Sequence, residues 1–290
     1  MNELRRKGLG LAVISYDSQA VLAAFSREHG ITFPLLSDPG SKTIKRFGLL
    51  NTVVKEALSP DRDNPQVQSE VRTYVSAFGV RPSMEGIAYP GTFILDRQGR
   101  VKARYFQDSY TVRNTVSSIM IRRGSSLAPV KGTKVSGGHL EITTFPSDRA
   151  VAPGNRFSIV LDVKPAAEIH LYAPGAARYG YRVVKLQIKP QPYLRVLPLG
   201  YPASQIYDFK PLKQRVPVYQ KPFRLVQGVV LEGTPQARKA LGGKQTITIT
   251  GALEYQACNE KICFDPASVP LSWTLTIRPL VFQHPVVQRR

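Results

Sequence analysis

The chain has 290 residues, of which 42% are hydrophobic and 21% charged, and its formal net charge is +20. This is the composition of an ordinary globular protein, so it excludes wholesale disorder and a collagen-like repeat, and the length favours two domains. Two cysteines are too few for a disulfide-rich miniprotein or a four-cysteine zinc module. No run of about 18 apolar residues predicts a membrane-spanning helix. The basic excess is spread over both halves without forming a basic arm, so we expect a solvated basic surface and no nucleic-acid partner.

The first part of the chain alternates between strand and helix patterns. A helix between Ser18 and Gly30 is predicted from the capping residues Asp17 and Ser18 and from the glycine that ends it. Further helices are expected over residues 41–47, ending at Gly48, and over 111–123. Short apolar or alternating runs predict strands at residues 10–15, 33–38, 91–96 and 100–106. The first part is therefore expected to be an α/β domain over residues 1–123.

The second part changes to short strand patterns separated by proline and glycine. Seven or more strands are predicted, with examples at residues 140–145, 156–163, 168–172, 183–188, 223–231, 244–255 and 269–277. Such a series is typical of an all-β sandwich. We therefore expect a linker over residues 124–136, a sandwich over 137–279 and a loose tail over 280–290.

The chain's two cysteines, Cys258 and Cys263, follow the end of a predicted strand with four residues between them. Asn259, Glu260 and Lys261 favour a tight turn that would let the sulfurs meet. Closing so short a loop stabilises a protein by only about 2 kcal/mol, so a large structural benefit is not the obvious purpose. An exposed hairpin disulfide can instead be attacked by an external thiolate. Lys261 would favour thiolate formation and Glu260 would oppose it.

The spacing by itself leaves three interpretations of the cysteine pair open. One is thiol–disulfide exchange, and another is a purely structural disulfide. The third, a metal pair, lacks two further ligands nearby in the sequence. The four histidines, His29, His139, His170 and His284, show no metal spacing and are expected to be surface or packing residues. No metal and no cofactor are therefore expected.

Four stretches of the second part resemble the N-terminal periplasmic domain of the thiol:disulfide interchange protein DsbD. They are residues 170–175, 216–219, 255–258 with Cys263, and 269–273, and the likeness extends over about 137–279. The resemblance implies an immunoglobulin-like sandwich in which Cys258 and Cys263 cycle between dithiol and disulfide. It also implies thioredoxin-like or membrane thiol–disulfide partners outside the cytoplasm. That family shields its cysteines with an aromatic cap loop, for which Tyr207, Asp208 and Phe209 are the candidates.

Three stretches of the first part resemble the redoxin branch of the thioredoxin-like fold, the AhpC/TSA relatives. They are residues 8–17, 31–40 and 89–96, and the likeness covers residues 1–123. The resemblance implies that Pro90 is a cis proline that presents backbone groups to a bound thiol partner. It also implies a reactive cysteine at the start of the first long helix, yet residues 1–257 contain no cysteine. Peroxide reduction therefore cannot proceed through a cysteine of this stretch.

Two explanations of the missing cysteine remain open, an N-terminally incomplete redoxin domain and a cysteine-less binding module. Residues 2–7 look like the last turn of the helix that should carry the cysteine. Without the strand before that helix, the apolar residues from Leu11 to Ile14 would be left as an exposed sheet edge, and this argument favours an incomplete domain. The first residues are charged and hold no export signal, so a periplasmic or otherwise extracytoplasmic location rests on the resemblance.

The expected function is a redox relay in which the Cys258–Cys263 pair exchanges electrons with thioredoxin-like partners, the work of a thiol–disulfide oxidoreductase. A non-catalytic interaction module with a structural disulfide is the alternative from another class. The third possibility is a fragment of a peroxiredoxin-like antioxidant protein.

Overall fold

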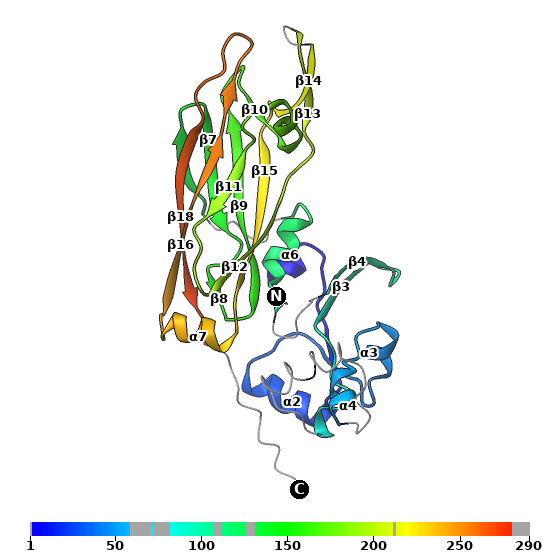
Figure 1. The fold of residues 1–290 in the computed structure, drawn as a ribbon. Helices are drawn as coiled ribbons and strands as arrows, with labels where there is room; N and C mark the ends of the chain where they lie inside the picture. Colours follow the sequence, from blue (N-terminus) through cyan, green and yellow to red (C-terminus); the bar gives the residue numbers. More distant parts are fainter. Residues whose placement is uncertain are drawn as a thin grey trace. The chain divides into compact units, whose positions relative to one another are not determined.

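The computed structural model of the chain describes residues 2–58, 71, 82–106, 112–125, 131–210 and 213–279 (Figure 1). The described residues form two compact units, one ending at Phe106 and the other running from Val112 to Pro279. The tail predicted over residues 280–290 lies outside the described residues. Among the described helices, none has the length and apolar character needed to cross a membrane.

The first unit mixes short helices with two pairs of strands. β1 and β2 pair in parallel, with Ile14 opposite Leu36, whereas β3 and β4 form an antiparallel pair. Helix α2 contacts β2. The elements are α1 (Asn2–Arg6), β1 (Val13–Ser15), α2 (Gln19–Glu28), β2 (Leu35–Ser37), α3 (Lys42–Arg46), α4 (Val53–Leu58), η1 (Pro82–Met84), β3 (Gly91–Leu95) and β4 (Val101–Phe106). The mixed α/β character predicted for this part is confirmed.

The predicted start and end of α2 are confirmed by its capping geometry. The Ser18 side chain accepts a hydrogen bond from the Val21 backbone N–H, which satisfies one of the donors left free in the first helical turn. Gly30 follows the helix with a φ of +59°, a conformation that glycine adopts without a steric penalty.

Apolar residues of the β1–β2 pair are exposed to solvent. Val13 is 42% exposed, Ile14 38% and Leu36 46%. Within the described part of the unit, β1 and β2 pair only with each other.

The expectation of a cis proline at position 90 is wrong. No cis peptide bond occurs within the described ranges, so the Tyr89–Pro90 bond is trans. Pro90 immediately precedes β3, a place where a trans proline is well tolerated because its missing N–H lies outside the strand.

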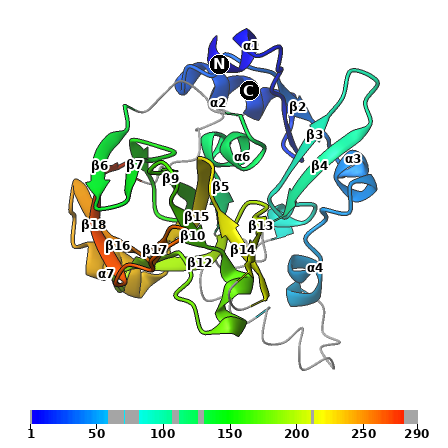
Figure 2. The ribbon, with the colours of Figure 1, turned by 90° about the horizontal axis from the view of Figure 1, so that it is seen from above.

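The described residues of the second unit form three sheets. The largest has the strand order β12-β15-β9-β7-β6, and β5 also pairs with β9. The other two have the orders β11-β16-β18-β8 and β13-β14-β10-β17. In Figure 2, β16 and β18 lie beside each other, apart from β9 and β15. The elements are β5 (Arg113–Asn114), α6 (Val116–Arg122), β6 (Thr133–Gly137), β7 (Leu140–Pro146), β8 (Ala150–Val151), β9 (Asn155–Pro165), β10 (His170–Tyr172), η2 (Pro174–Tyr179), β11 (Lys185–Ile188), β12 (Leu194–Gly200), β13 (Gln205–Phe209), β14 (Gln214–Tyr219), β15 (Phe223–Leu231), α7 (Pro235–Leu241), β16 (Thr246–Tyr255), β17 (Ala257–Cys258) and β18 (Ala267–Ile277).

The helix expected to close the first domain contacts the second unit instead. β5 pairs with β9, and the Ser118 hydroxyl of α6 lies 2.7 Å from the Ser158 hydroxyl of β9 in a buried hydrogen bond. The division between the units therefore comes before this helix rather than after Arg123. The predicted linker also overlaps β6, while residues 126–130 lie outside the described residues.

The main core of the second unit draws buried residues from the sheet that contains β7, β9 and β15 and from the sheet that contains β16 and β18. In β18, Val269, Leu271, Trp273 and Leu275 are buried while the residues between them are exposed or nearly so. The Trp273 indole N–H donates to the Thr144 hydroxyl at 2.9 Å, which links β18 to β7.

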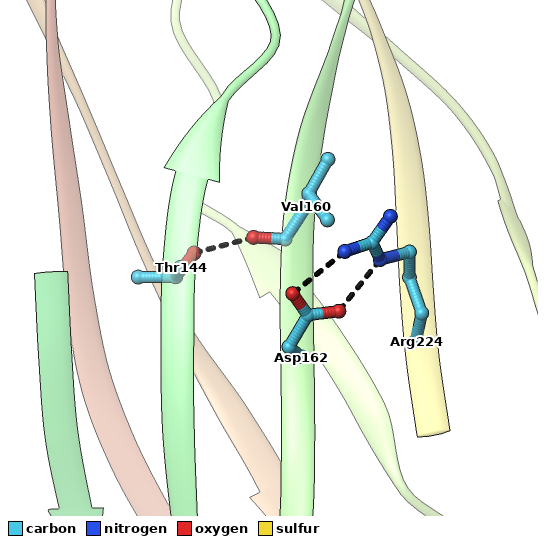
Figure 3. A network of polar contacts seen from close by, with 4 residues as sticks. All are labelled: Thr144, Val160, Asp162 and Arg224. Atoms are coloured by element: carbon cyan, nitrogen blue, oxygen red, sulfur yellow. Dashed lines mark hydrogen bonds and ion pairs between the residues drawn. The ribbon is translucent and has the colours of Figure 1, made fainter. Parts of the chain in front are cut away.

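Polar contacts also link neighbouring strands of the largest sheet (Figure 3). The Thr144 hydroxyl donates to the Val160 carbonyl of β9 at 2.8 Å. Two nitrogens of Arg224 on β15 donate to the two carboxylate oxygens of Asp162 on β9, at 2.6 and 2.7 Å. These contacts hold the register of β7, β9 and β15, the strands against which the rest of the unit packs.

Candidate redox site

Strand alternation in the third sheet places one cysteine on a different face from the main core. β10 pairs with β17, so that His170 lies opposite Cys258 and Leu171 lies opposite Ala257. Leu171 and Ala257 belong to the main core. Because successive side chains of a strand point to opposite faces, His170 and Cys258 share the other face. This second face forms a small separate cluster that includes Cys258, Tyr172, Val216 and Val218.

A short hairpin brings the two cysteines together, as the turn residues predict. The Asn259 backbone N–H donates to the Ile262 carbonyl at 3.0 Å. The Asn259 side-chain oxygen accepts from the backbone N–H groups of Lys261 and Ile262, both at 2.9 Å. Cys258 and Cys263 face each other across this turn with their Cα atoms 4.1 Å apart, and their sulfurs form a disulfide.

The two cysteines of this disulfide differ in their exposure to solvent. Cys258 is 1% exposed, held between β10 and the small cluster, whereas Cys263 is exposed at the end of the turn. An incoming thiolate must approach a sulfur directly, so access decides which sulfur is attacked. The geometry therefore offers Cys263 to a partner and keeps Cys258 out of reach.

Tyr172 on β10 supplies a hydrogen-bonding group to both sulfurs. Its hydroxyl donates to the Cys258 sulfur at 3.0 Å and lies 3.3 Å from the Cys263 sulfur. Its ring stacks on Tyr181, with ring centroids 4.2 Å apart. Burial, with the neighbouring phenols of Tyr181 and Tyr207, raises the pKa of Tyr172 well above its ordinary value. The hydroxyl therefore stays protonated and available as a donor.

The candidate cap residues lie on a strand rather than in a loop. Tyr207 and Phe209 belong to β13, which pairs with β14 along its whole length. Both rings line a cavity of about 50 Å³ together with both cysteines, His170 and Tyr172. The Tyr207 ring lies 4.5 Å from the His170 ring, measured between centroids. In Figure 1 the β13–β14 hairpin and the loop joining β16 to β18 extend at the same end of the second unit.

The structure thus brings four of the five predicted site residues around one cavity, namely Cys258, Cys263, Tyr207 and Phe209. The fifth, Pro90, belongs to the first unit. His170, predicted from the sequence to be a surface or packing residue, lines the same cavity, as do Tyr172 and Tyr181. The signal that identifies His170 and Tyr172 in retrospect is their alternation on one short strand, two residues apart.

Two protein families match the chain, one over the α/β part and the other over the strand-rich part. Residues 1–104 match the AhpC/TSA family, and residues 143–269 match the family described as thiol:disulfide interchange protein DsbD, N-terminal. The chain therefore joins a segment similar to the AhpC/TSA family to a segment similar to the DsbD N-terminal family, as the two resemblances predict. No curated protein matches the chain.

The solved structures found in the comparison include two N-terminal domains. One is the Neisseria meningitidis DsbD N-terminal domain in its reduced form, with 12% identity and a TM-score of 0.28, covering 40% of this chain and 74% of that one. The other is the N-terminal periplasmic domain of ScsB from Proteus mirabilis, with 13% identity and a TM-score of 0.34. That match covers 48% of this chain and half of the ScsB chain.

Proposed function

We propose that the second unit, an immunoglobulin-like sandwich, carries out thiol–disulfide exchange through Cys258 and Cys263 with thioredoxin-like partners in an extracytoplasmic compartment. The observation that carries the proposal is the asymmetry of the disulfide, an exposed Cys263 bonded to a buried Cys258 beneath the Tyr172 hydroxyl. The match to the DsbD N-terminal family supports the same reaction class. A disulfide between the chain's two cysteines also fits an oxidising compartment.

The exchange begins with a partner thiolate attacking the Cys263 sulfur. A bond forms between the partner sulfur and Cys263, the Cys258–Cys263 bond breaks, and Cys258 leaves as a thiolate. This thiolate forms in a buried site, where an uncompensated charge is costly. The Tyr172 hydroxyl, already 3.0 Å from that sulfur, stabilises it.

A second partner thiolate then attacks the partner sulfur of the mixed disulfide. The partner leaves as a disulfide, Cys263 is released as a thiolate, and both cysteines take up protons. Two electrons and two protons have then entered the pair, and the reverse sequence passes them to an oxidised acceptor.

The first unit takes no direct part in this electron transfer. Residues 1–257 contain no cysteine, so within this chain the redox chemistry falls to the second unit.

Mixed-disulfide mapping tests the proposal. Reduced thioredoxin whose second active-site cysteine is replaced by serine can attack the disulfide but cannot release itself. We expect a covalent adduct linked through Cys263, identified by peptide mass mapping. An adduct through Cys258 would contradict the proposed order of attack. The absence of any adduct would favour a non-catalytic module with a structural disulfide.

A further inference from the structure

We infer that His170 is the proton acceptor that activates Cys258 when the dithiol passes its electrons to an acceptor. The inference rests on the proposed exchange and concerns its return half, in which Cys258 must act as a nucleophile. Neither the fold nor the order of attack at Cys263 requires a histidine at this place.

The position of His170 is set by the strand register. It lies directly opposite Cys258 in the antiparallel pairing of β10 with β17. Side chains of directly opposed residues lie on the same face, with Cβ atoms typically about 4.5–5.5 Å apart. Both residues line the same small cavity, and both are buried, His170 at 3% exposure and Cys258 at 1%.

The chemistry of the return half creates a need for a base beside Cys258. The exposed Cys263 thiolate attacks the acceptor disulfide first, giving a mixed disulfide at Cys263 and releasing one acceptor thiolate. Cys258 must then lose its proton and attack the Cys263 sulfur. Cys258 is only 1% exposed, so its proton needs an acceptor inside the cavity rather than bulk water.

His170 supplies the base that accepts the Cys258 proton. The Cys258 proton moves to a ring nitrogen of His170 while the Cys258 sulfur forms a bond with the Cys263 sulfur. The bond between Cys263 and the acceptor breaks, and the electron pair leaves with the acceptor thiolate. The imidazolium then returns its proton to solvent or to the departing thiolate, so the protein regains its disulfide and a neutral His170.

The surroundings of His170 keep its ring neutral and ready to accept a proton. Burial lowers the pKa of His170 below its ordinary value, because the charged imidazolium is poorly solvated there. The titratable groups around it are the phenols of Tyr172, Tyr181 and Tyr207, the two cysteines, and Glu260 and Lys261 on the hairpin. Val216, from the adjacent β14, adds an apolar wall. The Tyr207 and Tyr172 rings contact the imidazole and fix its place.

Stepwise reaction of the reduced full chain with 5,5′-dithiobis(2-nitrobenzoate) separates the two steps. The first release of nitrothiobenzoate reports attack by the exposed Cys263, and the second reports attack by Cys258 on the mixed disulfide. In the wild-type chain we expect the second rate to stay level from alkaline pH to neutral pH. It should fall only in acid, where His170 becomes protonated.

The variant His170→Gln keeps a polar side chain of similar size but cannot serve as a base at neutral pH. We expect its second release to slow by about tenfold or more at pH 7. The rate should rise with pH towards the wild-type rate, since hydroxide then ionises Cys258 directly. The first release should be unchanged. His139→Gln is the matched control, because His139 stacks on Phe264 beside the hairpin and does not line the cavity.

A pH profile of the second release that is the same in wild type and His170→Gln would overturn the inference. A uniform loss of rate at all pH values, or equal losses in both steps, would also overturn it, because that result indicates a purely structural role. These outcomes do not depend on any thioredoxin-like partner. Failure of the inference is therefore distinguishable from failure of the proposed function, which the thioredoxin adduct reports.

Discussion

At the scale of single residues, the reactivity of the site depends on what surrounds each sulfur. Cys258 and Cys263 have the same chemistry in isolation, yet one is buried and hydrogen-bonded while the other is exposed. This difference assigns the attacked sulfur and the leaving sulfur. Cys258 is the leaving sulfur and it is buried. We therefore expect removal of the Tyr172 hydroxyl to slow reduction of the disulfide more than removal of any other group.

The variant Tyr172→Phe tests this assignment. A hydrogen bond to a charged group contributes about 1.5–3 kcal/mol, so its loss should slow reduction by a dithiol about ten- to a hundredfold. The measurement is the rate at which reduced thioredoxin opens the disulfide. Tyr181→Phe is the control, because the Tyr181 hydroxyl donates to the Gln214 side chain and not to a sulfur. Equal effects of the two substitutions would contradict the assignment.

The sequence identifies the cysteine pair and its turn, because these features are local in the chain. It does not identify Tyr172 or His170 as site residues, since they lie 86 residues or more before Cys258. Their place beside the sulfurs follows from the pairing of β10 with β17, and a two-residue strand such as β17 has no recognisable pattern of its own. The register between β10 and β17 is a long-range property, and the sequence pattern does not show it.

At the scale of elements, the hairpin and the cap strand shape the site. The Asn259 side chain holds the turn closed through two backbone N–H groups. Each such bond contributes about 0.5–1.5 kcal/mol, and less at an exposed site. The turn therefore raises the effective concentration of one thiol at the other.

The variant Asn259→Ala should make the disulfide easier to reduce. Losing about 1 kcal/mol of turn stability lowers the equilibrium constant for disulfide formation by about fivefold. Equilibration with mixtures of reduced and oxidised glutathione measures this constant. Asn259→Asp keeps an acceptor oxygen and should remain close to wild type. An unchanged constant in Asn259→Ala would show that the turn does not contribute.

Removing the Tyr207 ring should uncover Cys258. In the reduced chain, Tyr207→Ala is expected to raise the rate at which iodoacetamide modifies Cys258 several-fold, because the ring forms part of the cavity wall. Ile206→Ala is the matched control, since Ile206 is the preceding residue of the same strand and is 53% exposed on its other face. If both variants leave the rate unchanged, β13 does not act as a cap.

The strands that the sequence predicts well are those with strict alternation or long apolar runs, such as β15, β16 and β18. The two strands of the hairpin that carries Tyr207 and Phe209 are harder to predict. β13 is short and partly polar, and β14 contains Pro217. β12 contains Pro198 and a register shift between Val196 and Leu199. Proline and irregular pairing remove the period-two pattern on which such predictions rest.

At the scale of the whole molecule, the chain consists of two units with separate hydrophobic cores. The main core of the second unit draws its buried residues from Leu140 to Leu275, and the redox site lies beside the smaller separate cluster. Helix α6 also contains three buried apolar residues, Ile119, Met120 and Ile121. The sequence pattern assigned this helix to the first unit because a strand–helix alternation precedes it, and that pattern does not show which surface a helix covers.

The position of the boundary can be tested by comparing two shortened chains. A chain of residues 111–280 keeps α6 against β9, whereas a chain of residues 124–280 loses the Ser118–Ser158 contact and the buried residues of the helix. We expect the longer chain to unfold at the higher temperature in calorimetry and to keep the glutathione equilibrium of the full chain. Equal unfolding temperatures would place the boundary after Arg123.

The most direct test of the central claim is the redox state of Cys258 and Cys263 in the full chain, equilibrated with thioredoxin in dithiol–disulfide buffers and trapped by acid and alkylation. The account predicts that both cysteines gain and lose the alkyl label together as the buffer passes through the range of cellular thiol couples, about −180 to −270 mV. A pair that stays fully oxidised in the most reducing of these buffers, with thioredoxin present, would contradict it.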